Sequence, residues 1–199
     1  MKLINLGLPK SGTTTLGQAL GEAGFAVADW RIRTPDIRGF VGKLMYEGYF
    51  TTGDPLSLMP AYDAFTEISV VRDGLNFWPQ TDFGLIQAIR AHHPDARFLL
   101  TRRDPTALAD SMDRWSNLGR RRLPQSSVPG LPEGYGKAHD QKIRWIEGHY
   151  AFVDHIFAGS NVYLSVDVTQ DGAKDAIETF IERPLPWWGV ANAGKTAAE

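Results

Sequence analysis

The chain has 199 residues, of which 43% are hydrophobic and 22% charged, and its formal net charge is −2. This size predicts a single domain spanning residues 1–199, and the near-neutral charge argues against a dedicated nucleic-acid-binding protein. The absence of cysteine excludes disulfides and thiolate sites, and no apolar stretch has the length of a signal peptide or a membrane span, so a cytoplasmic location is the default expectation.

The first predicted elements are a strand, a glycine-bounded loop and a helix, within residues 3–16. An apolar run at residues 3–6 precedes the loop GLPKSG at residues 7–12, and a helical pattern begins near Thr13. Such a loop can turn its backbone N–H groups inward, and the helix directs the positive end of its dipole at the same place. The stretch therefore predicts an anion site, most often a phosphate site.

The spacing G-x-x-x-x-G is also that of nucleoside triphosphatase phosphate-binding loops, which continue with Lys and then Ser or Thr. Here Thr13 follows the second glycine, and the only lysine of the loop is Lys10, inside the turn. Its ammonium would approach a phosphate from a different side, so a site for a magnesium nucleotide fits poorly. A phosphate-loop nucleotide kinase or hydrolase with a relocated lysine remains the alternative function, and a catalytically silent nucleotide-binding module is a third.

Strand and helix patterns alternate along the rest of the chain. Strands are predicted at residues 25–28, 62–71, 97–101 and 161–166, and helices at residues 14–22, 36–48, 85–92, from Pro105 onward, 139–157 and 173–181. Alternation of this kind predicts an α/β fold with three layers, α/β/α, around a central parallel sheet, with ligands at the carboxyl ends of the strands. The glycine loop follows the first strand and is expected at that edge.

Two segments are expected to be less regular. Residues 119–138 contain several prolines and glycines, and a loop of this length in a compact domain is usually a functional lid or disordered. Its Arg120–Arg122 run is interpreted as a solvated basic run, although a lid over an anionic donor would also suit it. Residues 190–199 are predicted to fray.

The sequence resembles sulfotransferases that use 3′-phosphoadenosine 5′-phosphosulfate (PAPS). The motif PKSGTT at residues 9–14 resembles their phosphosulfate-binding loop, and residues 98–111 resemble their 3′-phosphate-binding segment, in which an Arg after a strand is followed eight positions later by a Ser, as Arg103 is by Ser111. Residues 163–167 and the amphipathic helix after them resemble the last strand and helix of the same fold.

The resemblance implies a phosphate-loop, nucleotide-hydrolase-like sulfotransferase fold that transfers a sulfuryl group from PAPS to a hydroxyl or amine. The acceptor would be a small molecule or a carbohydrate, and no metal is expected. The acceptor's identity and the oligomeric state stay open. The residues implied in donor binding are Pro9, Lys10, Ser11, Gly12, Thr13, Thr14, Thr15, Arg103 and Ser111.

Lys10 and Glu67 are the candidate catalytic residues. Lys10 would stabilise charge on the leaving phosphate. Glu67 lies in the predicted strand at residues 62–71, where many relatives hold a histidine base, and burial would raise its pKa toward the working pH. The alternative for Glu67 is an ion pair with Arg72 or Lys10.

The sequence also departs from the family pattern in two places. Thr15 stands where many relatives have a tryptophan that stacks on adenine. Gly194-Lys195 is only a weak counterpart of the Arg-Lys-Gly phosphate contact found near the end of many relatives.

Overall fold

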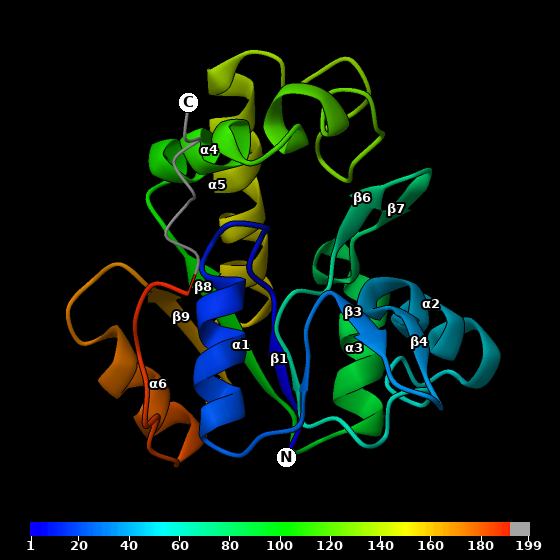
Figure 1. Ribbon diagram of the computed structural model, residues 1–199, viewed down its shortest axis with the longest axis vertical. Coiled ribbons are helices and arrows are strands. Elements are labelled where there is room, and N and C mark those ends of the chain that lie inside the picture. Colours follow the sequence, from blue (N-terminus) through cyan, green and yellow to red (C-terminus); the bar gives the residue numbers. More distant parts are fainter. Residues whose placement is uncertain (192–199) are drawn as a thin grey trace.

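The computed structural model describes residues 1–191, and its centre is a five-stranded sheet in the order β2-β5-β1-β8-β9 (Figure 1). All its strand pairs are parallel. The order runs outward from β1 in both directions, which places the topological switch point, and hence the expected ligand site, beside β1. The strands are β1 (Leu3–Asn5), β2 (Val27–Ala28), β5 (Ala64–Phe65), β8 (Arg97–Arg102) and β9 (Tyr163–Asp167).

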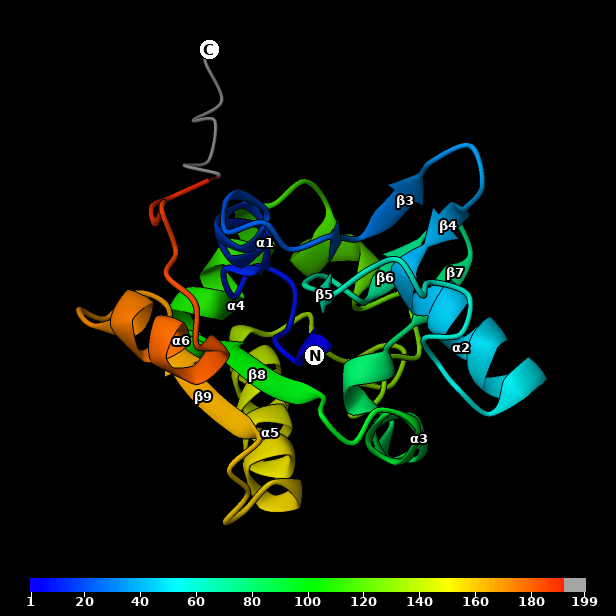
Figure 2. The same cartoon turned by 90° about the horizontal axis from the view of Figure 1, so that it is seen from below.

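Helices cover both faces of the sheet, so the predicted three-layer α/β/α fold is confirmed (Figure 2). The α-helices are α1 (Thr13–Glu22), α2 (Val41–Thr52), α3 (Phe83–His92), α4 (Pro105–Arg114), α5 (His139–Ile156) and α6 (Ala173–Ile181). Side chains alternate along β8, where Leu99 packs with α1 and α6 while Phe98 and Leu100 face the larger cluster that includes α3 and α5. This alternation is the period of two expected of a strand buried on both faces.

The strand predicted at residues 62–71 is wrong in extent. The chain pairs with the sheet only along β5, and β6 (Val70–Arg72) instead forms an antiparallel hairpin with β7 (Leu75–Phe77). Asp73 and Gly74 connect these strands with φ values of 53° and 80°. Two residues of positive φ favour a tight hairpin whose twist matches that of its strands.

The helix predicted at residues 36–48 also begins too early. Residues Arg38–Phe40 form β4, which pairs with β3 (Arg31–Arg33), and the helix α2 starts only at Val41. Ile37 and Phe40 have the spacing of apolar residues on a helix face, but antiparallel pairing with β3 determines an extended conformation for residues 38–40.

The segment at residues 119–138 is folded against the protein rather than structureless. It begins within a short π-helix, η2 (Leu118–Arg122), and Val128 and Leu131 form an isolated bridge. Leu123, Val128 and Leu131 have exposed fractions of 0%, 3% and 3% and belong to the larger core cluster. Movement of this segment as a lid stays a prediction.

The predicted fraying of residues 190–199 concerns mostly positions outside the described residues. Residues 192–199, including Gly194-Lys195, are in that part of the chain. Val190 and Ala191 are described, and the Ala191 N–H lies 3.4 Å from Thr15 Oγ1.

Asn5, at the end of β1, ties the strand ends of the ligand edge together. Its Nδ2 donates to the Thr66 carbonyl at 2.9 Å, and its Oδ1 accepts from the Gly7 N–H at 3.1 Å and the Thr101 N–H at 3.2 Å. Asn5 is fully buried, so bulk water does not reach these groups in the intact protein. The amide thus fixes how β1 enters the loop relative to β5 and β8.

We expect Asn5→Ala to lower the free energy of unfolding by about 2–4 kcal/mol, because several buried polar groups would lose their partner at once. Urea denaturation followed by circular dichroism measures the change. The matched control is Asn161→Ala, at an exposed position, where a change below about 0.5 kcal/mol is expected. A similar small change for Asn5→Ala would show that water replaces the amide.

Candidate functional site

The loop after β1 presents unpaired backbone donors. Lys10 and Gly12 have φ values of 76° and 102°, and a Cβ atom at Gly12 would lie 2.7 Å from Val168 Cγ2, so only glycine fits there. Among the hydrogen bonds of the described residues, none uses the N–H groups of residues 12–15. These donors surround the positive end of α1, which is the arrangement that binds phosphate and similar anions.

The loop forms one wall of a cavity of about 1380 Å³. The predicted site residues that line this cavity are Pro9, Lys10, Gly12, Thr13, Thr14, Thr15, Glu67, Arg103 and Ser111. The structure therefore brings together the two segments on which the resemblance rests, although they are about 90 positions apart in the chain.

Ser11 is the predicted binding residue that the structure does not bring to the cavity. It is fully buried, its hydroxyl lies 2.8 Å from the Thr101 hydroxyl, and its N–H donates to the Leu8 carbonyl at 3.1 Å. Its side chain thus holds the loop on β8, and its N–H closes the turn. A contribution of Ser11 to the site is indirect, through the position of the loop.

Arg103 leaves β8 toward the loop. Asp104 caps α4 by accepting from the Ala107 N–H at 2.9 Å, and the Tyr150 hydroxyl lies 3.2 Å from both the N–H and the carbonyl of Arg103. The guanidinium lies 3.5 Å from the Lys10 carbonyl, and its Nε is buried without a hydrogen-bond partner among the described residues. A buried donor of this kind fits an anionic ligand, because a bound oxyanion would satisfy it.

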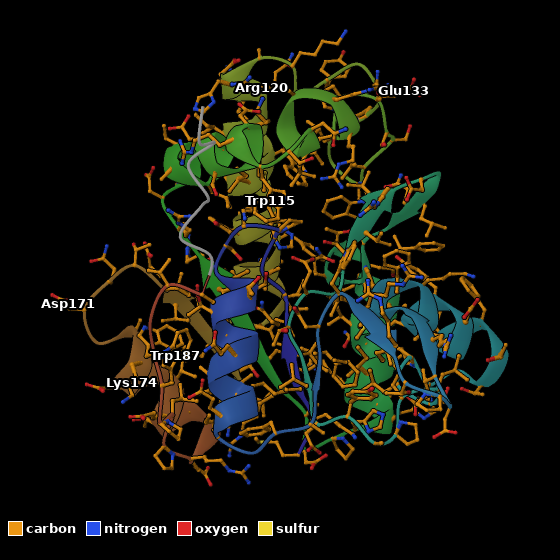
Figure 3. The ribbon with its side chains drawn as sticks, in the orientation of Figure 1. Trp115, Arg120, Glu133, Asp171, Lys174 and Trp187 are labelled. Carbon is orange, nitrogen blue, oxygen red and sulfur yellow. The ribbon has the colours of Figure 1, made fainter. Side chains whose placement is uncertain are left out.

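Lys10 has an aromatic neighbour that the sequence did not indicate. Its Nζ lies 3.5 Å from the centroid of the Trp115 ring, and Trp115 stands just above the loop (Figure 3). Burial lowers the pKa of Lys10 and the charge of Arg103 lowers it further, while Glu67 opposes them. No carboxylate of the described residues pairs with Lys10 within 4.0 Å, so its charge is free to act on a ligand.

Glu67 lies beside the loop and holds three hydrogen bonds. Oε1 accepts from the Ser69 hydroxyl at 2.6 Å and the Ser69 N–H at 3.1 Å, and Oε2 accepts from Thr13 Oγ1 at 3.3 Å. Burial raises the pKa of Glu67 to about 7, the bonds from Ser69 oppose the rise, and repulsion by Asp29 adds to it. A carboxyl that titrates near neutrality can exchange a proton with a ligand at physiological pH.

The alternative ion pair of Glu67 is not present in the described part of the chain. Arg72 pairs with Asp73 at 3.0 Å, and neither Arg72 nor Lys10 lies within 4.0 Å of the Glu67 carboxylate. Asp29 is a second, half-buried carboxyl on the cavity wall, which the sequence analysis did not indicate. It accepts from Thr66 Oγ1 at 2.9 Å, and burial raises its pKa.

The arrangement joins an anion-binding end to a proton acceptor. The positive end of the cavity consists of the loop N–H groups, Lys10 and Arg103. Glu67 lies next to this end, where it accepts from Thr13 Oγ1. Trp188 also lines the cavity, from the segment that passes Thr15. A cavity built in this way can hold an anionic group donor while a second molecule loses a proton to Glu67.

No three His, Asp or Glu side chains within residues 1–191 are grouped so that they could hold a metal ion. The helices in this part of the chain are too short or too polar to cross a membrane.

Comparison with known proteins identifies the family to which this site belongs. No curated protein matches the chain. The family model of the sulfotransferase domain matches residues 2–183, which include the loop, Glu67, Arg103 and Ser111, and the central parallel sheet between helices is consistent with the fold of that family. The chain therefore belongs to the sulfotransferase family, and the protein is a transferase.

Proposed function

We propose that the protein transfers a sulfuryl group from PAPS to a hydroxyl or amine of a small-molecule or carbohydrate acceptor. One observation carries the proposal. The cavity is lined by Lys10, by Arg103, whose buried Nε–H has no partner among the described residues, and by the free N–H groups of the loop. The same cavity is lined by Glu67, whose pKa is about 7. The cavity volume of about 1380 Å³ leaves room for a nucleotide and an acceptor together.

Two anion sites suit a nucleotide with phosphates at its 5′ and 3′ positions. The N–H groups of residues 12–15 and the Lys10 ammonium would hold the 5′-phosphosulfate, as a helix N-terminus does in other phosphate sites. Arg103 and Ser111 would bind the 3′-phosphate, because both line the cavity and Arg103 has a free Nε–H.

The reaction would be an in-line displacement at sulfur. Glu67 accepts the proton of the acceptor while the acceptor oxygen or nitrogen forms its bond to sulfur, and the bond between sulfur and the bridging oxygen breaks. The electron pair of that bond stays on the 5′-phosphate, where Lys10 and the loop N–H groups stabilise the charge. Glu67 then releases its proton to water. Its pKa of about 7 suits both halves of this proton transfer.

Binding of the product nucleotide tests the donor site. We expect adenosine 3′,5′-bisphosphate to raise the melting midpoint of the protein, and Arg103→Ala to remove most of the increase, because the charged contact to the 3′-phosphate would be lost. Thermal unfolding with and without the nucleotide measures this.

The matched control for the donor-binding test is Arg114→Ala, since Arg114 is exposed and lies at the other end of α4. ATP with Mg²⁺ should give the smaller shift. An equal bisphosphate shift in Arg103→Ala would place the 3′-phosphate elsewhere, and a larger shift with ATP and Mg²⁺ would favour a nucleotide kinase or hydrolase.

A further inference from the structure

The cavity has a second positively charged end, away from the donor residues. The hairpin β6–β7 lies on the opposite side of the loop from β9 and α6 (Figure 1). Arg72 of the hairpin and Arg121 and Arg122 of η2 line the cavity. Trp30 adds an aromatic wall there, with the Arg72 guanidinium 5.9 Å from its ring centroid.

Arg122 joins these two elements and keeps one donor unused. Its Nη1 donates to the Val71 carbonyl at 3.0 Å, while its Nε is buried and has no partner among the described residues. Burial lowers the pKa of Arg122 and the charge of Arg72 lowers it further, against the opposing effect of Asp73. The cations Arg72 and Arg122 therefore lie close together, and no carboxylate in the described part of the chain forms an ion pair with the half-buried Arg122.

The acidic groups nearby do not neutralise this end. Within residues 1–191, Asp73 forms an ion pair with Arg72 alone, and their side chains are 78% and 53% exposed, respectively, which makes the pair weak in water. Asp29 and Glu67 line the cavity, yet neither forms an ion pair with Arg72, Arg121 or Arg122 in the part of the chain described. Positive charge is thus left for a ligand.

The side chains at this end are arginines, and this indicates which chemical groups the ligand carries. A guanidinium presents a planar fork of donors that matches the paired oxygens of carboxylate, phosphate or sulfate, and a half-buried, unpaired guanidinium is unfavourable until such a group arrives. Lys10 and Arg103 already serve the donor in the proposed function. The arginines of β6 and η2 therefore remain for the acceptor.

We propose that the acceptor carries an anionic group, a carboxylate, phosphate or sulfate, which Arg122 binds together with Arg72 and Arg121. The inference rests on the proposed function, since it assigns this end of the cavity to the acceptor. Binding of the anion would turn the acceptor hydroxyl or amine toward Glu67. This residue lines the same cavity and precedes the β6–β7 hairpin in the sequence.

Calorimetric binding of matched phenols to the protein saturated with adenosine 3′,5′-bisphosphate tests the inference. The probes are 4-hydroxyphenylacetate, 4-hydroxyphenyl phosphate and the neutral 4-hydroxyphenylacetamide, so that the arms separate a carboxylate from a phosphate. We expect one of the anions to bind at least about tenfold more tightly than the amide, and Arg122→Gln to abolish that preference. Bisphosphate affinity should change less than about twofold in the variant.

Arg120→Gln is the matched control, because Arg120 belongs to the same η2 but is exposed and does not line the cavity (Figure 3). Arg121→Gln repeats the test if Arg122→Gln does not fold, since Arg121 is exposed and its one side-chain hydrogen bond to a described residue runs from Nε to Gln125 Oε1, at 3.2 Å.

Equal affinity for the amide, no binding of either anion, or an equal loss in Arg120→Gln would overturn the inference. A loss of bisphosphate binding in Arg122→Gln would assign the arginine to the donor instead. If the wild-type protein bound no bisphosphate but still preferred the anions, the proposed function would fail and the anion site would stand.

Discussion

Lys10→Ala is expected to lower the turnover number by about 100- to 1000-fold, because Lys10 would stabilise charge that grows on the leaving phosphate only as the bond to sulfur breaks. Nucleotide affinity should fall much less, by about tenfold, since the N–H groups of residues 12–15 would still hold the 5′-phosphate. Single-turnover rates give the first quantity, and calorimetry with adenosine 3′,5′-bisphosphate gives the second.

Two further variants separate catalysis from folding. Lys10 has a φ of 76°, which an L-residue adopts only with strain, so Lys10→Gly should lose turnover like Lys10→Ala while keeping or raising the melting temperature. Lys137→Ala is the charge-matched control at an exposed position outside the cavity and should leave turnover unchanged. Equal losses of affinity and turnover in Lys10→Ala would mean that Lys10 only holds the donor.

The sequence predicted the elements that local signals determine. The apolar run before the glycine loop became β1, and Asp104-Pro105 became the cap and first residue of α4 as expected. Both signals depend on residues close together in the chain: an N-cap carboxylate satisfies a free N–H within its own helix, and Pro at the first position loses no bond. The parallel sheet followed from the alternation of strands and helices.

Residues that act through distant contacts were missed. Asn5 is a polar residue within an apolar strand, and its partners at Thr66 and Thr101 become visible only when β5 and β8 lie on either side of β1. Trp115 likewise has no motif, because its position over Lys10 depends on how α4 ends. The position of the Ser11 side chain was also unpredictable, since a loop serine can face either a ligand or the core.

The β6–β7 hairpin, in contrast, carried a local signal that could have been read. Asp73-Gly74 stands between short β-prone runs, a pattern typical of a two-residue hairpin turn. Recognising it would have assigned residues 70–72 to a hairpin strand, β6, rather than to the central sheet.

Glu67→Gln is expected to lower turnover at pH 8 by about 100- to 10,000-fold and to remove the rise of the rate with pH that Glu67 should produce around pH 7. The amide cannot accept a proton, yet it is similar in size and can keep accepting from Ser69. Binding of adenosine 3′,5′-bisphosphate should be nearly unchanged. Turnover measured from pH 5 to pH 9 tests the expectation, with the exposed Glu133→Gln as the matched control (Figure 3).

The same variant should change how stability depends on pH. Because the folded-state pKa of Glu67 is raised from 4.5 to about 7, the folded protein binds this proton more tightly than the unfolded chain does. The contribution of Glu67 to stability is therefore fully present below about pH 4.5 and is lost as the pH rises through about 7. Glu67→Gln removes this loss, so its melting temperature relative to the wild type should increase from pH 5 to pH 8.

His149 does not disturb this comparison. Burial lowers its pKa to about 4, so its own contribution is lost as the pH falls below about 6.5, but it is present in both proteins and cancels in the difference. If Glu67→Gln instead melted lower at every pH and the folded fraction kept its turnover, Glu67 would be a structural carboxyl. The base would then be sought at Asp29, the other carboxyl on the cavity wall with a raised pKa.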